Sequence, residues 1–95
     1  MTEQEIYHKA LMRWGLDDQV MMAMGECGEL IAALNRYYNQ RRGELSEVAE
    51  EIADVEIMMG QMRLLVGSEE VDKIKQRKLG RLRRILNGEV SHPHA

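Results

Sequence analysis

Several residue types are scarce in this sequence, and each shortage excludes a kind of structure. Among 95 residues there is no Phe, a single Pro at Pro93 and a single Cys, Cys27. One Cys excludes a disulfide within the chain and fits a reducing compartment. Because no Pro precedes Pro93, proline does not interrupt a long helix in the rest of the chain. We therefore expect a helical and cytoplasmic protein.

Long apolar runs are lacking too, and we expect no secretory leader. No stretch approaches the roughly 18 apolar residues that a membrane span needs, and the segment Met1–Glu5 is polar and acidic. We therefore expect no membrane as a partner. The length predicts one domain over residues 1–95, and a core this small often gains from pairing with a second copy. A homodimer or homotetramer is expected.

The charges of the chain are unevenly distributed, although the net charge is only −3. Acids dominate between Glu44 and Glu56, and bases dominate between Lys73 and Arg84. A basic helix can bind nucleic acid, but the neighbouring acids and the negative net charge oppose that function. An ordinary solvated charged face is the simpler interpretation of the basic segment.

Apolar residues recur at helical spacing through most of the chain. Asp17 or Asp18 is the expected N-cap of the second helix and Ser68 that of the fourth, while residues 89–95 are expected to form a disordered tail. Short connections between long helices predict an all-α, antiparallel four-helix bundle. The four helices are expected at Thr2–Arg13, from Asp17 or Asp18 to Gln40, at Glu44–Val66 and at Ser68–Asn87.

Three of these helices carry an apolar stripe, and we expect each stripe to face the core. Arg41-Arg42-Gly43 forms the predicted turn between the second and third helices. The stripe residues are Val20, Met24, Cys27, Ile31, Leu34 and Tyr38, then Leu45, Val48, Ile52, Val55, Met59, Met62 and Val66, and finally Val71, Ile74, Leu82 and Ile85.

Two pairs of acids flank the stripes: Glu26 with Glu29, and Glu51 with Asp54. Acids three residues apart share a helix face and repel each other, and acids beside a core need a cation or a donor. If the two helices fold back on each other, Glu26 comes level with Asp54 and Glu29 with Glu51. Four converging carboxylates predict Mg²⁺ or Mn²⁺, and Mg²⁺ commonly binds phosphates as well. A solvated acidic face is the alternative.

Two further features bear on this site. A di-iron carboxylate bundle needs Glu-x-x-His pairs, and the histidines of this chain lie outside the second and third helices, which opposes that metal. Gly25 and Gly28 lie within the second helix, where Gly is unfavourable. Close approach of another backbone or of a ligand would explain them, and an accidental weak spot is the alternative.

The motifs Glu26-Cys27-Gly28-Glu29 and Glu51-Ile52-Ala53-Asp54 resemble the E-x-x-E and E-x-x-D pairs of the MazG-like all-α nucleoside triphosphate pyrophosphatases. The resemblance covers roughly residues 14–86, and the form around Gly25 is similar to the branch that contains dCTP pyrophosphatase. It implies a MazG-like helical fold and a Mg²⁺-dependent cleavage of nucleoside triphosphates to monophosphate and pyrophosphate. It also implies a role in removing surplus or noncanonical nucleotides.

The resemblance further implies how individual residues act. Glu26, Glu29, Glu51 and Asp54 would bind the metal, and Glu26 would also take a proton from the attacking water. The family's Lys-x-x-x-Asn-x-x-Arg pattern is not matched, because the last helix lacks the Asn. The expected substrate contacts are Trp14 and Gln19 for the base, and Lys75, Lys78 and Arg81 for the phosphates. Plain packing is the alternative for Trp14, and a non-catalytic dimerisation or interaction module is the alternative function.

Overall fold

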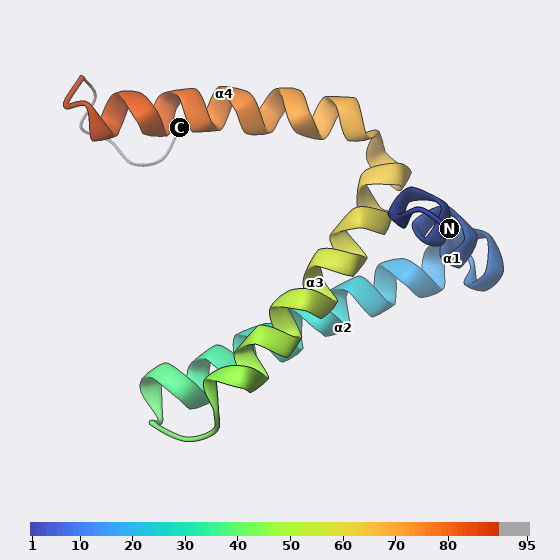
Figure 1. Cartoon of the computed structure of the whole chain (residues 1–95), viewed down its shortest axis with the longest axis horizontal. Helices are drawn as coiled ribbons and strands as arrows, with labels where there is room; N and C mark the ends of the chain where they lie inside the picture. The colour runs from blue at the N-terminus through green and yellow to red at the C-terminus, as the bar shows by residue number, and fades with distance from the viewer. Residues whose placement is uncertain (90–95) are drawn as a thin grey trace. The chain divides into compact units, whose positions relative to one another are not determined.

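The computed structural model describes residues 1–89, and all of its regular structure there is helical (Figure 1). The all-α prediction is therefore confirmed. Residues 90–95, which make up most of the predicted tail, lie outside the described residues. The helices are α1 (Glu3–Trp14), α2 (Leu16–Leu34), the π-helix η1 (Asn35–Asn39), α3 (Leu45–Val66) and α4 (Ser68–Leu86).

Two helices begin at glycines, and both predicted N-caps are wrong. Gly15, at φ 89°, is the N-cap of α2, so Asp17 and Asp18 lie inside its first turn. Gly67, at φ 102°, is the N-cap of α4, so Ser68 is its first helical residue. A positive φ favours Gly, which lets one helix end and the next begin within a single residue. The two aspartates still favour α2, because negative charge in the first turn complements the helix dipole.

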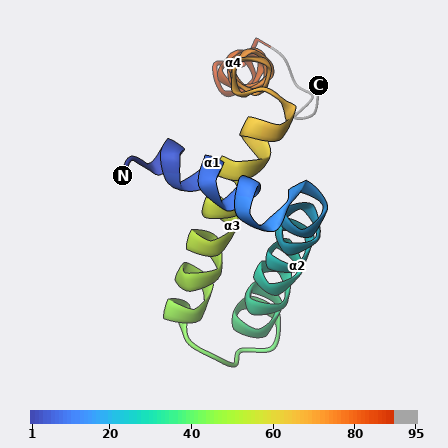
Figure 2. The same cartoon turned by 90° about the vertical axis from the view of Figure 1, so that its right-hand side faces the viewer.

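The first compact unit spans Met1–Leu65 and contains α1, α2 and most of α3. α2 and α3 run antiparallel, side by side (Figures 1 and 2). α1 packs on α3 through the ring of Tyr7, which lies directly against Gly60. A Cβ at Gly60 would lie 2.6 Å from the Tyr7 Cζ atom, so this contact requires a residue without a side chain.

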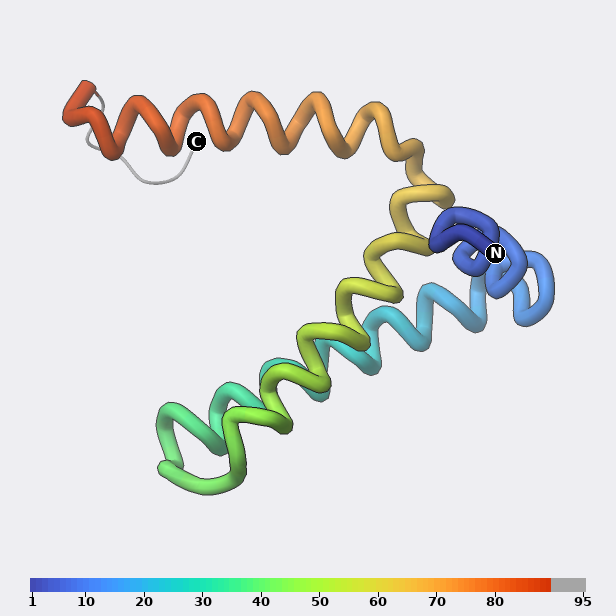
Figure 3. The backbone as a smooth tube through the Cα atoms, viewed as in Figure 1, coloured from blue at the N-terminus to red at the C-terminus, as the bar shows by residue number. Residues whose placement is uncertain are grey.

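The connection between α2 and α3 follows the prediction closely (Figure 3). The last residues of α2 widen into η1, and π-helical segments of this kind occur often near functional sites. The chain then turns through Arg41 at φ 56° and Gly43 at φ 76°. The backbone N–H of Arg42 donates to the carbonyl of Arg36 at 2.8 Å. The predicted turn at 41–43 is therefore confirmed.

The faces that meet between α2 and α3 differ from the predicted stripes. Ala23 and Ala33 are buried, whereas Met24 is 63% exposed and Ile31 is 69% exposed. The predicted core stripe of α2 is therefore wrong: the helix buries small side chains and leaves large apolar ones exposed. The predicted stripe of α3 is also wrong for most of its length. Val48 is buried, but four other members are exposed, namely Leu45, Ile52, Met59 and Val66.

The second compact unit begins at Val66 and carries α4. Apolar residues on one side of α4, with the stems of two lysines, line a groove of about 430 Å³; they are Val71, Ile74, Lys75, Lys78, Leu79 and Leu82. The packing of all four helices in one bundle stays a prediction. Within residues 1–89, no helix is long and apolar enough to cross a membrane.

Candidate metal centre

A buried hydrogen bond shows how α2 and α3 are aligned. The Nε2 atom of Gln19 donates to Oε1 of Gln61 at 2.7 Å. Glu26 follows Gln19 by about two helical turns, and Asp54 precedes Gln61 by the same distance. The register that the sequence predicts, with Glu26 level with Asp54, is the register of the structure. Gln61 was not among the predicted site residues, although it shares a helix face with Asp54.

Three of the four predicted carboxylates come together between the two helices. Glu26, Glu51 and Asp54 each offer one carboxylate oxygen, and these atoms all lie within 4.8 Å of one another. Glu26 and Glu51 are half-buried, while Asp54 is exposed. We call these three residues the carboxylate cluster. Glu29 is exposed and stands outside this group, so the fourth predicted ligand is nearby but does not converge.

Glu51 occupies the least hydrated position in the cluster. Its Oε2 atom is buried and has no hydrogen-bond partner among residues 1–89. Burial raises the pKa of the Glu51 carboxyl above its ordinary value, because the charged form loses hydration. Nearby negative charges raise this pKa further, and they belong to Asp54, Glu26, Glu29 and Glu50. A bound cation would relieve both effects at once.

The chemistry of the donors fits a hard divalent cation. Carboxylate oxygens are the ligands that Mg²⁺ and Mn²⁺ prefer. Because Glu26 belongs to α2 while Glu51 and Asp54 belong to α3, acids from both helices lie within reach of one ion. A Cβ at Gly25 or Gly28 would meet nothing within 4 Å. Within the described chain, therefore, no other backbone approaches these glycines, contrary to one explanation offered for them.

The residues predicted to contact the base lie in different surroundings. Trp14 is exposed, and the guanidinium carbon of Arg13 lies 5.6 Å from its ring centroid. Gln19 is only 5% exposed, and its amide is bonded to Gln61. The side chain of Gln19 therefore has a protein partner in the place of the predicted base, whereas Trp14 keeps a surface open to a ligand.

The predicted phosphate contacts all lie on α4, within the second unit. Lys75 and Lys78 are exposed, and Arg81 is half-buried. The Nε atom of Arg81 is buried without a hydrogen-bond partner among the described residues. A hollow of about 320 Å³ on this helix is lined by four bases, Arg77, Lys78, Arg81 and Arg84. Such a concentration of positive charge suits an anionic ligand.

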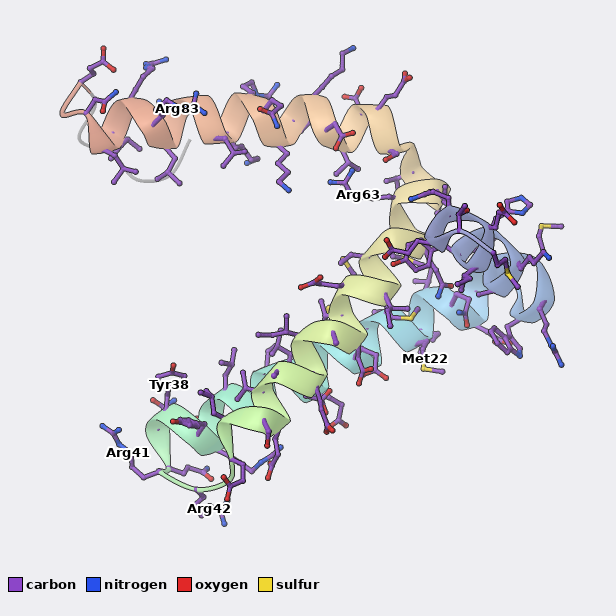
Figure 4. The ribbon with its side chains drawn as sticks, in the orientation of Figure 1. Met22, Tyr38, Arg41, Arg42, Arg63 and Arg83 are labelled. Atoms are coloured by element: carbon purple, nitrogen blue, oxygen red, sulfur yellow. The ribbon has the colours of Figure 1, made fainter. Side chains whose placement is uncertain are left out.

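The carboxylate cluster is the part of the described chain best suited to chemistry. Its three oxygen donors would leave further coordination positions of a divalent cation open to water and phosphate oxygens. Exposed side chains elsewhere in the first unit include Met22 on α2, Tyr38 in η1, and Arg41 and Arg42 in the turn (Figure 4). Comparisons with protein-family models, curated proteins and solved structures gave no match for this chain.

Proposed function

We propose that this chain is a Mg²⁺-dependent nucleotide pyrophosphohydrolase of the cytoplasm. It would cleave (deoxy)nucleoside triphosphates to a monophosphate and pyrophosphate, and so remove surplus or noncanonical nucleotides. The observation that carries the proposal is the convergence of Glu26, Glu51 and Asp54 within 4.8 Å. The unpartnered oxygen of Glu51 adds to it, because a buried carboxylate without a donor is costly unless a cation binds it.

In this mechanism the residues of the first unit hold the metal and the water. Glu51 and Asp54 on α3 would hold the cation together with Glu26 on α2, and Glu29 remains the fourth ligand that the resemblance implies. When bound, Mg²⁺ supplies a Lewis acid for phosphate oxygens and lowers the pKa of a bound water. Glu26 accepts the proton of the attacking water.

Residues outside the cluster would bind the rest of the nucleotide. The exposed ring of Trp14 stacks on the base. The resemblance implies that positive side chains stabilise the charge that develops on the phosphates, and Lys75, Lys78 and Arg81 are the residues it implies for this role. A panel of nucleotides would reveal which base the site prefers.

The decisive experiment is a panel of ribo- and deoxynucleoside triphosphates with Mg²⁺, assayed separately for pyrophosphate and orthophosphate. We expect pyrophosphate from at least one nucleotide and its loss in Glu51→Gln. Glu44→Gln is the matched control, since Glu44 is an exposed acid outside the cluster. Orthophosphate without pyrophosphate would mean cleavage at another bond, and no release by folded protein would refute the enzyme.

The second candidate is a non-catalytic helical dimerisation or interaction module. It is favoured by the exposed apolar side chains of α2, above all Met24 and Ile31. A module of this kind would self-associate equally with and without Mg²⁺, and Glu51→Gln would leave its association unchanged. Metal-dependent pyrophosphate release distinguishes the two functions directly.

A further inference from the structure

The Gln19–Gln61 pair is an unusual feature of the α2–α3 contact. The two side chains are 5% and 4% exposed, and they are the buried polar residues of the described chain. The Nε2 atom of Gln61 also faces the sulfur of Met58 at 3.8 Å, which is a weak acceptor. Buried amides are tolerated only where their hydrogen bonds are made, so this pair restricts how the two helices can lie.

The rest of the contact would permit the helices to slide. The other buried residues of α2 and α3 are apolar, namely Ala23, Ala33, Val48 and Met58, and the bond that Met58 accepts comes from Gln61 on its own helix. Beyond the cluster, Arg36 and Glu47 approach at 3.8 Å, but both are partly exposed, and exposed ion pairs contribute little. Slippage would thus meet resistance mainly from the amide pair.

A shift of α3 by one turn shows what the pair prevents. It would bring Gln19 level with an apolar residue such as Met58 or Leu65, leaving two buried amides without partners. A buried polar group without a hydrogen bond is strongly unfavourable. The same shift would separate the oxygens of Glu26, Glu51 and Asp54. The register that satisfies the amides is therefore also the register that assembles the cluster.

The carboxylate cluster itself opposes this register before metal binds. The acids of α2 and α3 repel each other when they converge, so without the amide pair the metal-free protein would relax toward a shifted or separated arrangement. We propose that Gln19 and Gln61 are a positioning pair, which holds α2 and α3 in the metal-binding register against this repulsion. This inference rests on the proposed metal site, although neither glutamine touches the metal.

The test is Mn²⁺ binding by the full chain, measured from the EPR signal of free Mn²⁺, alongside thermal unfolding. In Gln19→Leu/Gln61→Leu both amides are replaced by apolar groups of similar size, an exchange that is often neutral for stability. We expect an unfolding midpoint equal to or above that of the unmodified protein, with Mn²⁺ affinity at least tenfold weaker. Leu11→Met, which changes a buried apolar side chain of α1 and removes no hydrogen bond from the pair, is the matched control and should keep its affinity.

The outcomes separate the inference from the function on which it rests. If the unmodified protein binds no Mn²⁺, the proposed function fails. If it binds, and the folded double variant binds equally well, the positioning role alone is overturned. Should the double variant lack a cooperative transition, Gln61→Met serves instead, because it keeps an unbranched side chain and removes the acceptor. A tenfold loss in that variant supports the inference, and unchanged affinity overturns it.

Discussion

At the scale of single residues, Glu51 combines burial, negative neighbours and an oxygen without a donor. The raised pKa means that the folded protein holds this proton more tightly than the unfolded chain does. Its contribution to stability is therefore fully present below the ordinary Glu pKa and is lost as pH rises through the higher folded pKa. Near neutral pH without metal, the charged carboxylate destabilises the fold.

Glu51→Gln should therefore raise the unfolding temperature of the metal-free protein near neutral pH and weaken its dependence on pH above the ordinary carboxyl range. In saturating Mg²⁺ the order should reverse, so that the unmodified protein unfolds at a higher temperature than Glu51→Gln. At about a hundredfold excess over Kd, binding stabilises a protein by roughly 2.7 kcal/mol, and the variant should gain little of this. Differential scanning calorimetry with and without Mg²⁺ measures both effects. A metal-free Glu51→Gln protein less stable than the unmodified chain would contradict this account.

At the scale of helices, the sequence predicted the elements better than the faces they bury. The long helices, the turn at 41–43 and the alignment of Glu26 with Asp54 all follow from periodicity and turn chemistry. The buried faces do not, because hydrophobicity alone ranks Met24 and Ile31 above Ala23 and Ala33. Which side chains become buried depends on how the helices pack, and the spacing along one helix does not contain that information. The helix caps were missed for a related reason, since a glycine with positive φ replaces the usual side-chain cap.

The contact between α1 and α3 also depends on a missing side chain. Gly60→Ala would place a methyl group into the ring of Tyr7, and overpacking of this kind costs about 1–3 kcal/mol. Gly25→Ala is the control on α2, where the added Cβ meets nothing within 4 Å. There the higher helix propensity of Ala should stabilise the protein by up to about 1 kcal/mol. Urea unfolding followed by circular dichroism measures both.

A loss of stability in Gly25→Ala would mean that something outside the described chain approaches that glycine. A second chain or a bound ligand would then be the explanation for the small residues of α2. An unchanged Gly60→Ala protein would instead show that α1 moves freely away from α3. The two substitutions together thus test whether glycine serves close packing at each position.

At the scale of the whole molecule, several large apolar residues of α2 and α3 stay exposed within the described part of the chain. Val20, Met24, Cys27 and Ile31 recur at alternating intervals of four and three residues, the spacing that lets helices pack along a seam. Clusters of exposed large apolar residues mark interaction surfaces. A second copy of the chain would cover such a stripe with the same stripe, as two-fold symmetry requires.

We therefore expect a dimer or tetramer in solution that depends on this stripe. Ile31→Glu should shift the protein toward monomer, because a buried, unpaired carboxylate at an interface is strongly unfavourable. Ser46→Glu adds the same charge at an exposed polar position of α3 and should leave assembly intact. Light scattering coupled to size-exclusion chromatography gives both masses. A monomeric unmodified protein, still folded at micromolar concentration, would show that these apolar side chains remain in water and that the chain is stable without a partner.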